Sequence, residues 1–308
     1  MNRAMAWTIL SGALNVAAVL LLAPLFQGIL RKITARIQSR QGPPVWQPYF
    51  DLLKLLGKED IESGETPAMQ RFAAYLSLAT VLTLACLVPM GVAAPMNGAG
   101  DVILLIYLLT LSGICTLLAG LAAGSTYSLL GISREMMSMI SLEPLLVVVL
   151  ITGALHVHSL RLDSVLNGSL YSGGGIPWSG LVLLGVMLAA FQAFVQRVPF
   201  DISEAETELM EGPLVEYSGP KLALFKYAHM VKLIIYSALF ASLFMPWGSH
   251  LEFPMGWLLF WMKVLGLVLL VTLVAATHAR YRIDQAIRYF ASLLVVAAIG
   301  LVLASYGY

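Results

Sequence analysis

Charge is scarce in this sequence. Only 11% of its 308 residues are charged and 59% are hydrophobic, whereas a soluble domain of this size carries roughly 25% charged residues. This composition excludes an ordinary soluble enzyme and a disordered chain. The net charge of +1 gives no electrostatic reason to expect a nucleic-acid partner.

Cysteine is nearly absent as well. The two cysteines, Cys86 and Cys115, both lie in apolar runs. They are not spaced as metal ligands are, and they indicate no disulfide framework. The sequence also shows no iron–sulfur ligand set, haem signature or nucleotide-binding loop. The chain is therefore expected to carry no electrons alone, and we predict no catalytic residue, metal site or bound cofactor in it.

Apolar runs long enough to cross a membrane make up most of the chain. A membrane helix needs about 20 mainly apolar residues, and runs of this length do not alternate as the strands of an outer-membrane barrel do. We predict an all-α polytopic membrane protein that forms one integral domain over residues 1–308. About eight spans are expected, at roughly 5–30, 72–94, 101–122, 135–154, 178–196, 222–246, 256–277 and 286–306.

The distribution of Lys and Arg predicts the orientation. Fourteen of them fall on one side of the predicted spans, and only Arg3 and Arg161 fall on the other. Because cytoplasmic loops carry the excess of basic residues, the first side should be cytoplasmic. The sequence thus predicts a multi-pass protein of a prokaryotic cytoplasmic (inner) membrane, with both termini outside.

The first long cytoplasmic segment, residues 31–71, is called here the basic loop. Lys32, Arg36 and Arg40 recur every four residues, so they share one face of a helix. After a turn at Gly42-Pro43-Pro44 comes a second amphipathic stretch. That stretch is too short and too charged to span, so it should lie on the membrane surface or on a partner.

The second long cytoplasmic segment, residues 197–221, is called the acidic loop. Six of the seventeen acids lie between Asp201 and Glu216. A continuous helix would place Asp201, Glu204, Glu208 and Glu211 on one face and Glu206 away from it. Helix capping accounts for the first two acids but not for the later ones. Crowded carboxylates raise one another's pKa values, so the cluster is expected either to hold and pass protons or to pair with a basic partner.

Three charged residues lie well inside predicted spans, away from the span ends. Such residues are costly in a membrane and are functional by default. Glu143 is the strongest candidate, because the neighbouring Pro144 frees a backbone carbonyl and leaves room for water. Lys232 and Lys263 also qualify, although each lies close enough to a membrane face for its ammonium group to reach it.

The loop motifs resemble a known family. The basic loop reads Ala35-Arg-Ile-Gln-Ser-Arg-Gln-Gly-Pro43 and then Gln47-Pro-Tyr-Phe-Asp-Leu-Leu-Lys54. The acidic loop contains Pro199-Phe-Asp-Ile-Ser-Glu-Ala-Glu206 and Glu216-Tyr-Ser-Gly219, and the fourth span contains Ile140-Ser-Leu-Glu143. Together these resemble the membrane subunit that anchors the peripheral arm of respiratory complex I, which also implies an eight-helix fold of that type.

One stretch of the acidic loop departs from the quinone-reducing members of that family. Those members usually continue with Ala-Gly-Tyr-His-Thr before Glu-Tyr-Ser-Gly, whereas Met210-Glu-Gly-Pro-Leu-Val215 stands here. This version looks like the membrane anchor of group 4 membrane-bound [NiFe] hydrogenases, the formate hydrogenlyase and energy-converting type.

The resemblance implies a non-catalytic subunit of a membrane-bound oxidoreductase. The [NiFe] site and the iron–sulfur clusters would then lie on partners: the hydrogenase large and small subunits and a ferredoxin-like iron–sulfur subunit, with antiporter-like subunits beside the chain in the bilayer. The implied role is to anchor the peripheral arm and to help couple its redox chemistry to proton or sodium movement. A complex I-type subunit lining a quinone site is the alternative, and a self-contained transporter is a third reading.

The basic loop (31–71) and the acidic loop (197–221) are expected to form one cytoplasmic docking surface. These expectations assign two sets of residues. The residues predicted to dock the peripheral arm are Arg36, Arg40, Gly42, Pro43, Asp51, Lys54, Arg134 and Arg197. The residues predicted for the ion pathway are Glu143, Asp201, Glu204, Glu206, Glu208, Glu211, Glu216, Lys232 and Lys263.

Overall fold

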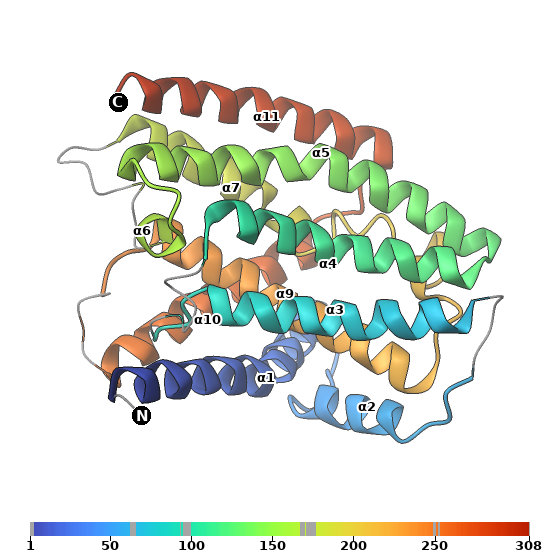
Figure 1. Cartoon of the computed structure of the whole chain (residues 1–308). Helices are drawn as coiled ribbons and strands as arrows, with labels where there is room; N and C mark the ends of the chain where they lie inside the picture. The colour runs from blue at the N-terminus through green and yellow to red at the C-terminus, as the bar shows by residue number, and fades with distance from the viewer. Residues whose placement is uncertain are drawn as a thin grey trace.

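The computed structural model describes residues 3–61, 66–92, 94, 100–166, 170, 177–248, 251 and 253–307. Figure 1 shows long helices running roughly side by side in one bundle, with the short helices at its two ends. The long helices are α1 (Arg3–Ile37), α3 (Pro67–Leu87), α4 (Val102–Ala123), α5 (Thr126–Val157), α7 (Trp178–Phe194), α9 (Gly219–Phe244), α10 (Met255–Thr277) and α11 (Ile283–Ser305). The short elements are α2 (Gln47–Leu56), α6 (Leu162–Leu166), α8 (Glu206–Leu209) and the 3-10 turn η2 (Gly212–Leu214).

The all-α polytopic prediction is confirmed. Among the described residues, seven helices are long and apolar enough to span a membrane, and α7 is a shorter apolar helix of 17 residues. The predicted fourth span is the C-terminal part of α5, which begins earlier because Ser125 caps it by accepting the backbone N–H of Ser128 at 3.3 Å. Both ends of the chain lie at the same end of the bundle, as an even number of crossings requires (Figure 1). We call this the terminal end, and the opposite end the loop end.

Helix α9 lies at the centre of the bundle. Most of its side chains are buried, and it packs against α1, α2, α3, α7 and α10. Helix α11, in contrast, lies at the edge and packs on α5 and α7 (Figure 1). Lys221 on α9 is therefore buried and Lys232 partly buried within the protein, whereas the apolar faces of the outer helices are left for lipid or for other subunits.

A proline in α1 fixes two other helices to it. Pro24 has no N–H, so the carbonyl of Leu20 loses its helical partner. The hydroxyl of Tyr227 on α9 donates to that carbonyl at 2.8 Å. The hydroxyl of Tyr49 on α2 donates to the next carbonyl, that of Leu21. The surface helix α2 and the central helix α9 thus meet the same point of α1.

The basic loop and the acidic loop meet at the loop end, whereas their shared role as a docking surface stays a prediction. Lys221, at the start of α9, is buried and pairs with Asp60 at 3.2 Å. Gly219 has a φ of 56°, and a side chain there would come within 2.5 Å of the Glu59 carbonyl. This close approach requires glycine and brings the two loops into one surface.

Candidate functional site: a polar cluster inside the helix bundle

Two adjoining cavities lie within the bundle. The larger, of about 240 Å³, lies at the loop end between α1, α9 and the acidic loop. Its polar lining includes Gln27, Arg197, Glu204, Lys226, His229 and Lys232. The smaller, of about 50 Å³, surrounds Glu143 between α4, α5 and α9. Both cavities have room for water, because a water molecule needs about 10–15 Å³ of accessible cavity volume.

A carboxylate, an amide and an ammonium group connect the two cavities. Glu135 on α5 is only 4% exposed and accepts a hydrogen bond from Nε2 of Gln196. The Oε1 atom of the same amide accepts from Nζ of Lys232 on α9 at 3.4 Å. Lys232 lines the smaller cavity together with Glu143. Two acids from α5 thus flank one lysine from α9, which offsets part of the cost of placing each charge in the bundle.

Glu204 is the residue of the acidic loop whose carboxyl pKa is raised. Its side chain is partly buried in the larger cavity. Burial raises the pKa of Glu204 to about 7, and the nearby carboxylates of Asp201 and Glu135 add to the effect. Arg197 and Lys232 oppose this rise. A carboxyl with a pKa near 7 can both take up and release a proton under physiological conditions.

The prediction of a continuous acidic helix is wrong. Residues 201–205 are not helical, and α8 comprises only Glu206–Leu209. The chain then turns through Met210, whose φ is 59°, and Gly212, whose φ is 53°. The acids that a helix would align are thereby separated. The Glu206 side chain lies outside the described residues, and Glu216 is partly buried in the turn before α9.

Three of these acids bind three different cations, from α5, from α9 and from the connection between α10 and α11. The ion pairs are Asp201 with Arg280 at 3.3 Å, Glu208 with Arg134 at 2.6 Å, and Glu211 with Lys226 at 3.2 Å. The hydrogen bond and the charge of Arg134 lower the pKa of Glu208. A proton shared among Glu204, Glu208 and Glu211 therefore has no structural basis, because two of the three are neutralised by their own partners.

The predicted docking residues separate into an outward and an inward group. Arg36, Arg40, Pro43 and Lys54 are exposed at the loop end, and Gly42 is partly exposed. Asp51 is partly buried and pairs with Arg31 at 2.8 Å.

Arg134 and Arg197 form the inward group. Arg134 holds the acidic loop by donating to Glu208 and, at 3.4 Å, to the carbonyl of Ile202. Arg197 donates to Oε1 of Gln27 at 2.6 Å and lines the larger cavity. Both arginines thus bind the chain's own residues, and their contact with a peripheral arm stays a prediction.

Lys263 does not join the polar cluster. Its ammonium group donates to the carbonyls of Met245 at 2.6 Å and of Trp247, which follow the end of α9. It lines a different cavity, between the end of α9 and the start of α10. These contacts satisfy the hydrogen bonding of the lysine and of the end of α9 together, and the place of Lys263 in an ion pathway stays a prediction.

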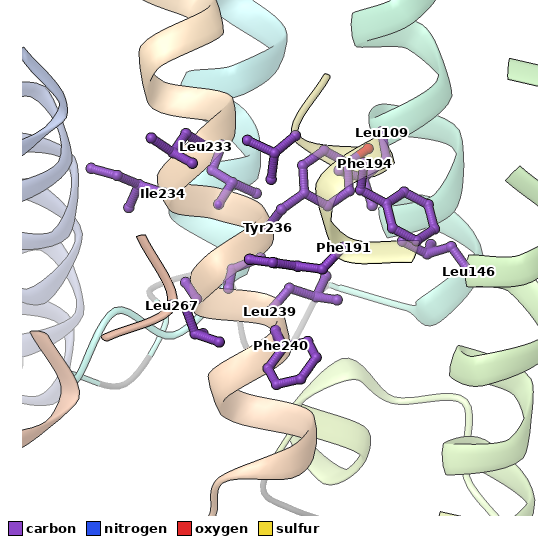
Figure 2. Packing of buried hydrophobic residues seen from close by; sticks show 14 of the residues in the cluster. Leu109, Leu146, Phe191, Phe194, Leu233, Ile234, Tyr236, Leu239, Phe240 and Leu267 are labelled. Carbon is purple, nitrogen blue, oxygen red and sulfur yellow. The ribbon is translucent and has the colours of Figure 1, made fainter. Parts of the chain in front are cut away.

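An aromatic layer closes the cluster toward the terminal end. Tyr236 and Phe240 follow Lys232 on α9 by about one and two helical turns. Tyr236 stacks on Phe194 with ring centroids 5.5 Å apart, and Phe240 packs on Phe191 at 5.3 Å. Figure 2 shows these rings filling the space between α9 and its neighbours. Water entering from the loop end therefore meets a packed apolar barrier beyond Lys232.

Three polar residues in the walls of these cavities were not predicted from the sequence. Glu135 precedes Glu143 by eight residues in the same apolar run, and His229 lies three residues before Lys232, hence on the same face of α9. Those spacings were the available signal. No sequence pattern points to Gln196, because its role depends on its contacts with Glu135 of α5 and Lys232 of α9. Within the part of the chain that the structure describes, no three His, Cys, Asp or Glu side chains lie close enough to hold a metal ion.

Comparison with known proteins identifies the family. The family model described as NADH dehydrogenase matches residues 10–305. The chain belongs to the NADH dehydrogenase subunit 1/H family. Hydrogenase-4 component C of Escherichia coli (strain K12) is 38% identical over 87% of this chain and 85% of that protein. Formate hydrogenlyase subunit 4 of the same organism is 33% identical over 85% of this chain and 87% of that protein.

Other relatives in the family come from quinone-dependent and sulfur-reducing complexes. NADH-quinone oxidoreductase subunit 8 of Thermus thermophilus is 33% identical over 92% of this chain and 82% of that protein. The solved structure of the membrane-bound sulfane sulfur reductase, an archaeal respiratory membrane complex, has a matching chain with a TM-score of 0.87 and 26% identity. That match covers 96% of this chain and 99% of the other. The protein is thus a membrane subunit of a respiratory-type complex, and it has partner subunits of such a complex.

Proposed function

We propose that the chain anchors the peripheral [NiFe] arm of a membrane-bound hydrogenase complex and helps couple its redox chemistry to proton or sodium movement. The observation that best supports coupling is the polar cluster of Glu135, Gln196, Lys232 and Glu143. Buried ionisable groups in a membrane bundle are expensive to maintain, and this cluster adjoins a cavity at the end where the arm would dock.

The geometry suggests a direction for the ion. It would enter at the loop end, where Glu204 can exchange a proton near neutral pH. It would then pass through the cavities to Lys232 and Glu143. Since the aromatic layer at Tyr236 blocks a direct route to the terminal end, the ion would leave sideways toward a neighbouring membrane subunit.

This proposal also assigns the partners and the location. The [NiFe] site and the iron–sulfur clusters belong to the large, small and ferredoxin-like subunits, and antiporter-like subunits continue the ion route. The exposed cations Arg36, Arg40 and Lys54 would contact the arm on the cytoplasmic side of the inner membrane. Both termini would then lie outside, in agreement with the basic bias of the loop end.

A quinone site is the second candidate function, and one cavity favours it. A cavity of about 380 Å³ lies between α1 and α10 with largely apolar walls, including Leu30 and Val271. It shares Gln27, Arg31 and Arg197 with the polar cavity of about 240 Å³ at the loop end. An apolar pocket with a polar end is typical of a site for a small amphipathic molecule, and several relatives carry a quinone oxidoreductase name.

Purification of the intact complex through a tag on this chain separates the two functions. The hydrogenase proposal predicts a nickel-containing large subunit with four metal-binding cysteines, together with hydrogen evolution or uptake. The quinone alternative predicts a large subunit without these cysteines and quinone-dependent electron transfer. Co-purified partners that include no redox subunit would contradict both.

A further inference from the structure

Gln196 occupies the junction between the two cavities. Among the described residues, Gln196 and Lys232 line both of them. The Gln196 amide is also the group that links the acid on α5 to the base on α9. A glutamine suits this junction, because one end of its amide donates to a carboxylate while the other end accepts from an ammonium group.

The backbone at Gln196 connects the junction to the acidic loop. Gln196 is the second residue after the end of α7 and has a φ of 54°, a left-handed conformation that costs free energy for any residue with a side chain. Its N–H donates to the carbonyl of Ala193 at 3.0 Å. The next residue, Arg197, is bound to Gln27 of α1 at 2.6 Å. A shift of the acidic loop or of α1 would therefore move Gln196.

We infer that Gln196 is a positioning residue that keeps Glu135 and Lys232 apart and closes the passage between the cavities until the acidic loop moves. This inference rests on the proposed coupling function. With the amide in place, the lysine is bound to a neutral group and the junction is filled. With the amide withdrawn, Lys232 gains direct access to Glu135 and water joins the two cavities. Ion passage toward Glu143 is then linked to the position of the loop beneath the peripheral arm.

Two substitutions separate the bulk of the side chain from its hydrogen bonds. Gln196→Ala removes both, whereas Gln196→Met keeps nearly the same length without the amide. The intact complex is reconstituted in liposomes, and two quantities are measured: passive proton permeability without redox substrate, and ions moved per electron during turnover. Thr116→Val and Ser138→Ala are the controls, because each changes the wall of one cavity and leaves the junction intact.

We expect Gln196→Ala to raise the resting permeability several-fold and to lower the ions moved per electron. Gln196→Met should leave the resting permeability unchanged, because its side chain still fills the junction, and should still lower the coupling ratio, because the amide that binds both Glu135 and Lys232 is gone. Both controls should match the wild type. A merely structural role would lower assembly and turnover together without changing the ratio of ions to electrons.

Two results would overturn the inference: an assembled Ala variant with wild-type resting permeability, or an assembled Met variant with a wild-type coupling ratio. Failure of the proposed function looks different. A wild-type complex that moves no ions during turnover refutes coupling, and the resting permeability of the Ala variant still decides whether Gln196 separates the cavities.

Discussion

Replacing Glu204 by Gln removes the most strongly perturbed carboxyl of the acidic loop. The pKa of Glu204 is raised from 4.5 to about 7. This shift means that ionisation of the carboxyl lowers the free energy of unfolding by roughly 3 kcal/mol. Between these two pH values the folded state binds more protons than the unfolded chain, so stability falls as the pH rises. Above the higher value the loss is complete.

The amide introduced by this substitution would carry no charge at any pH. Glu204→Gln should therefore match the wild type at the acidic end of this range and be more stable above neutral pH, by up to about 3 kcal/mol. The assay is the thermal unfolding midpoint of the solubilised complex measured across this pH range. If catalytic turnover is measured in parallel, its pH profile should lose the transition near pH 7 that is expected of the wild type.

Glu208→Gln is the matched control. The pKa of Glu208 is lowered by Arg134, so its charge stabilises the fold and the substitution should give no gain at high pH. Wild-type and Glu204→Gln midpoints that stay parallel across the whole pH range would refute the assignment of a raised pKa to Glu204.

Three further substitutions test other parts of the structure. Arg36→Glu combined with Arg40→Glu should release the peripheral arm while the membrane subunit stays inserted, and normal co-purification of the arm would contradict this role. Gly131→Ala should displace the acidic loop and lower coupled activity, because the new methyl group would lie 2.8 Å from Cδ of Pro213; unchanged protease sensitivity of the loop would contradict the clash. Lys263→Met should lower stability by about 1–3 kcal/mol through two unpaired carbonyls and leave the coupling ratio unchanged; a fall in the ratio would return Lys263 to the ion pathway.

The spans and the meeting of the two loops could be predicted from sequence because each depends on local pattern. Apolar runs of sufficient length must become helices in a bilayer, where backbone groups need internal partners. An even number of spans places both termini at one end, and the basic bias then places both long loops at the other. Glu143 could be proposed from the sequence for a similar reason, since an acid in an apolar run can be recognised without a structure.

The arrangement of the acidic loop could not be predicted in this way. Helical spacing aligns Glu204, Glu208 and Glu211 only if the chain stays helical, and the pairing of Glu208 with Arg134 and of Glu211 with Lys226 favours another path. Those cations lie on α5 and α9, outside the acidic loop itself. Gln196 was invisible for the same reason, because its importance follows from its two neighbours and not from its own chemistry.

Glu143→Gln tests the central claim most directly. The substitution keeps the shape and hydrogen bonding of the side chain and removes its charge from the smaller cavity. The measurement is the number of ions moved per electron by the assembled complex in liposomes, compared with the wild type. The proposed function predicts normal assembly with a strongly reduced ratio, and an assembled variant with the wild-type ratio would contradict an ion route through this chain.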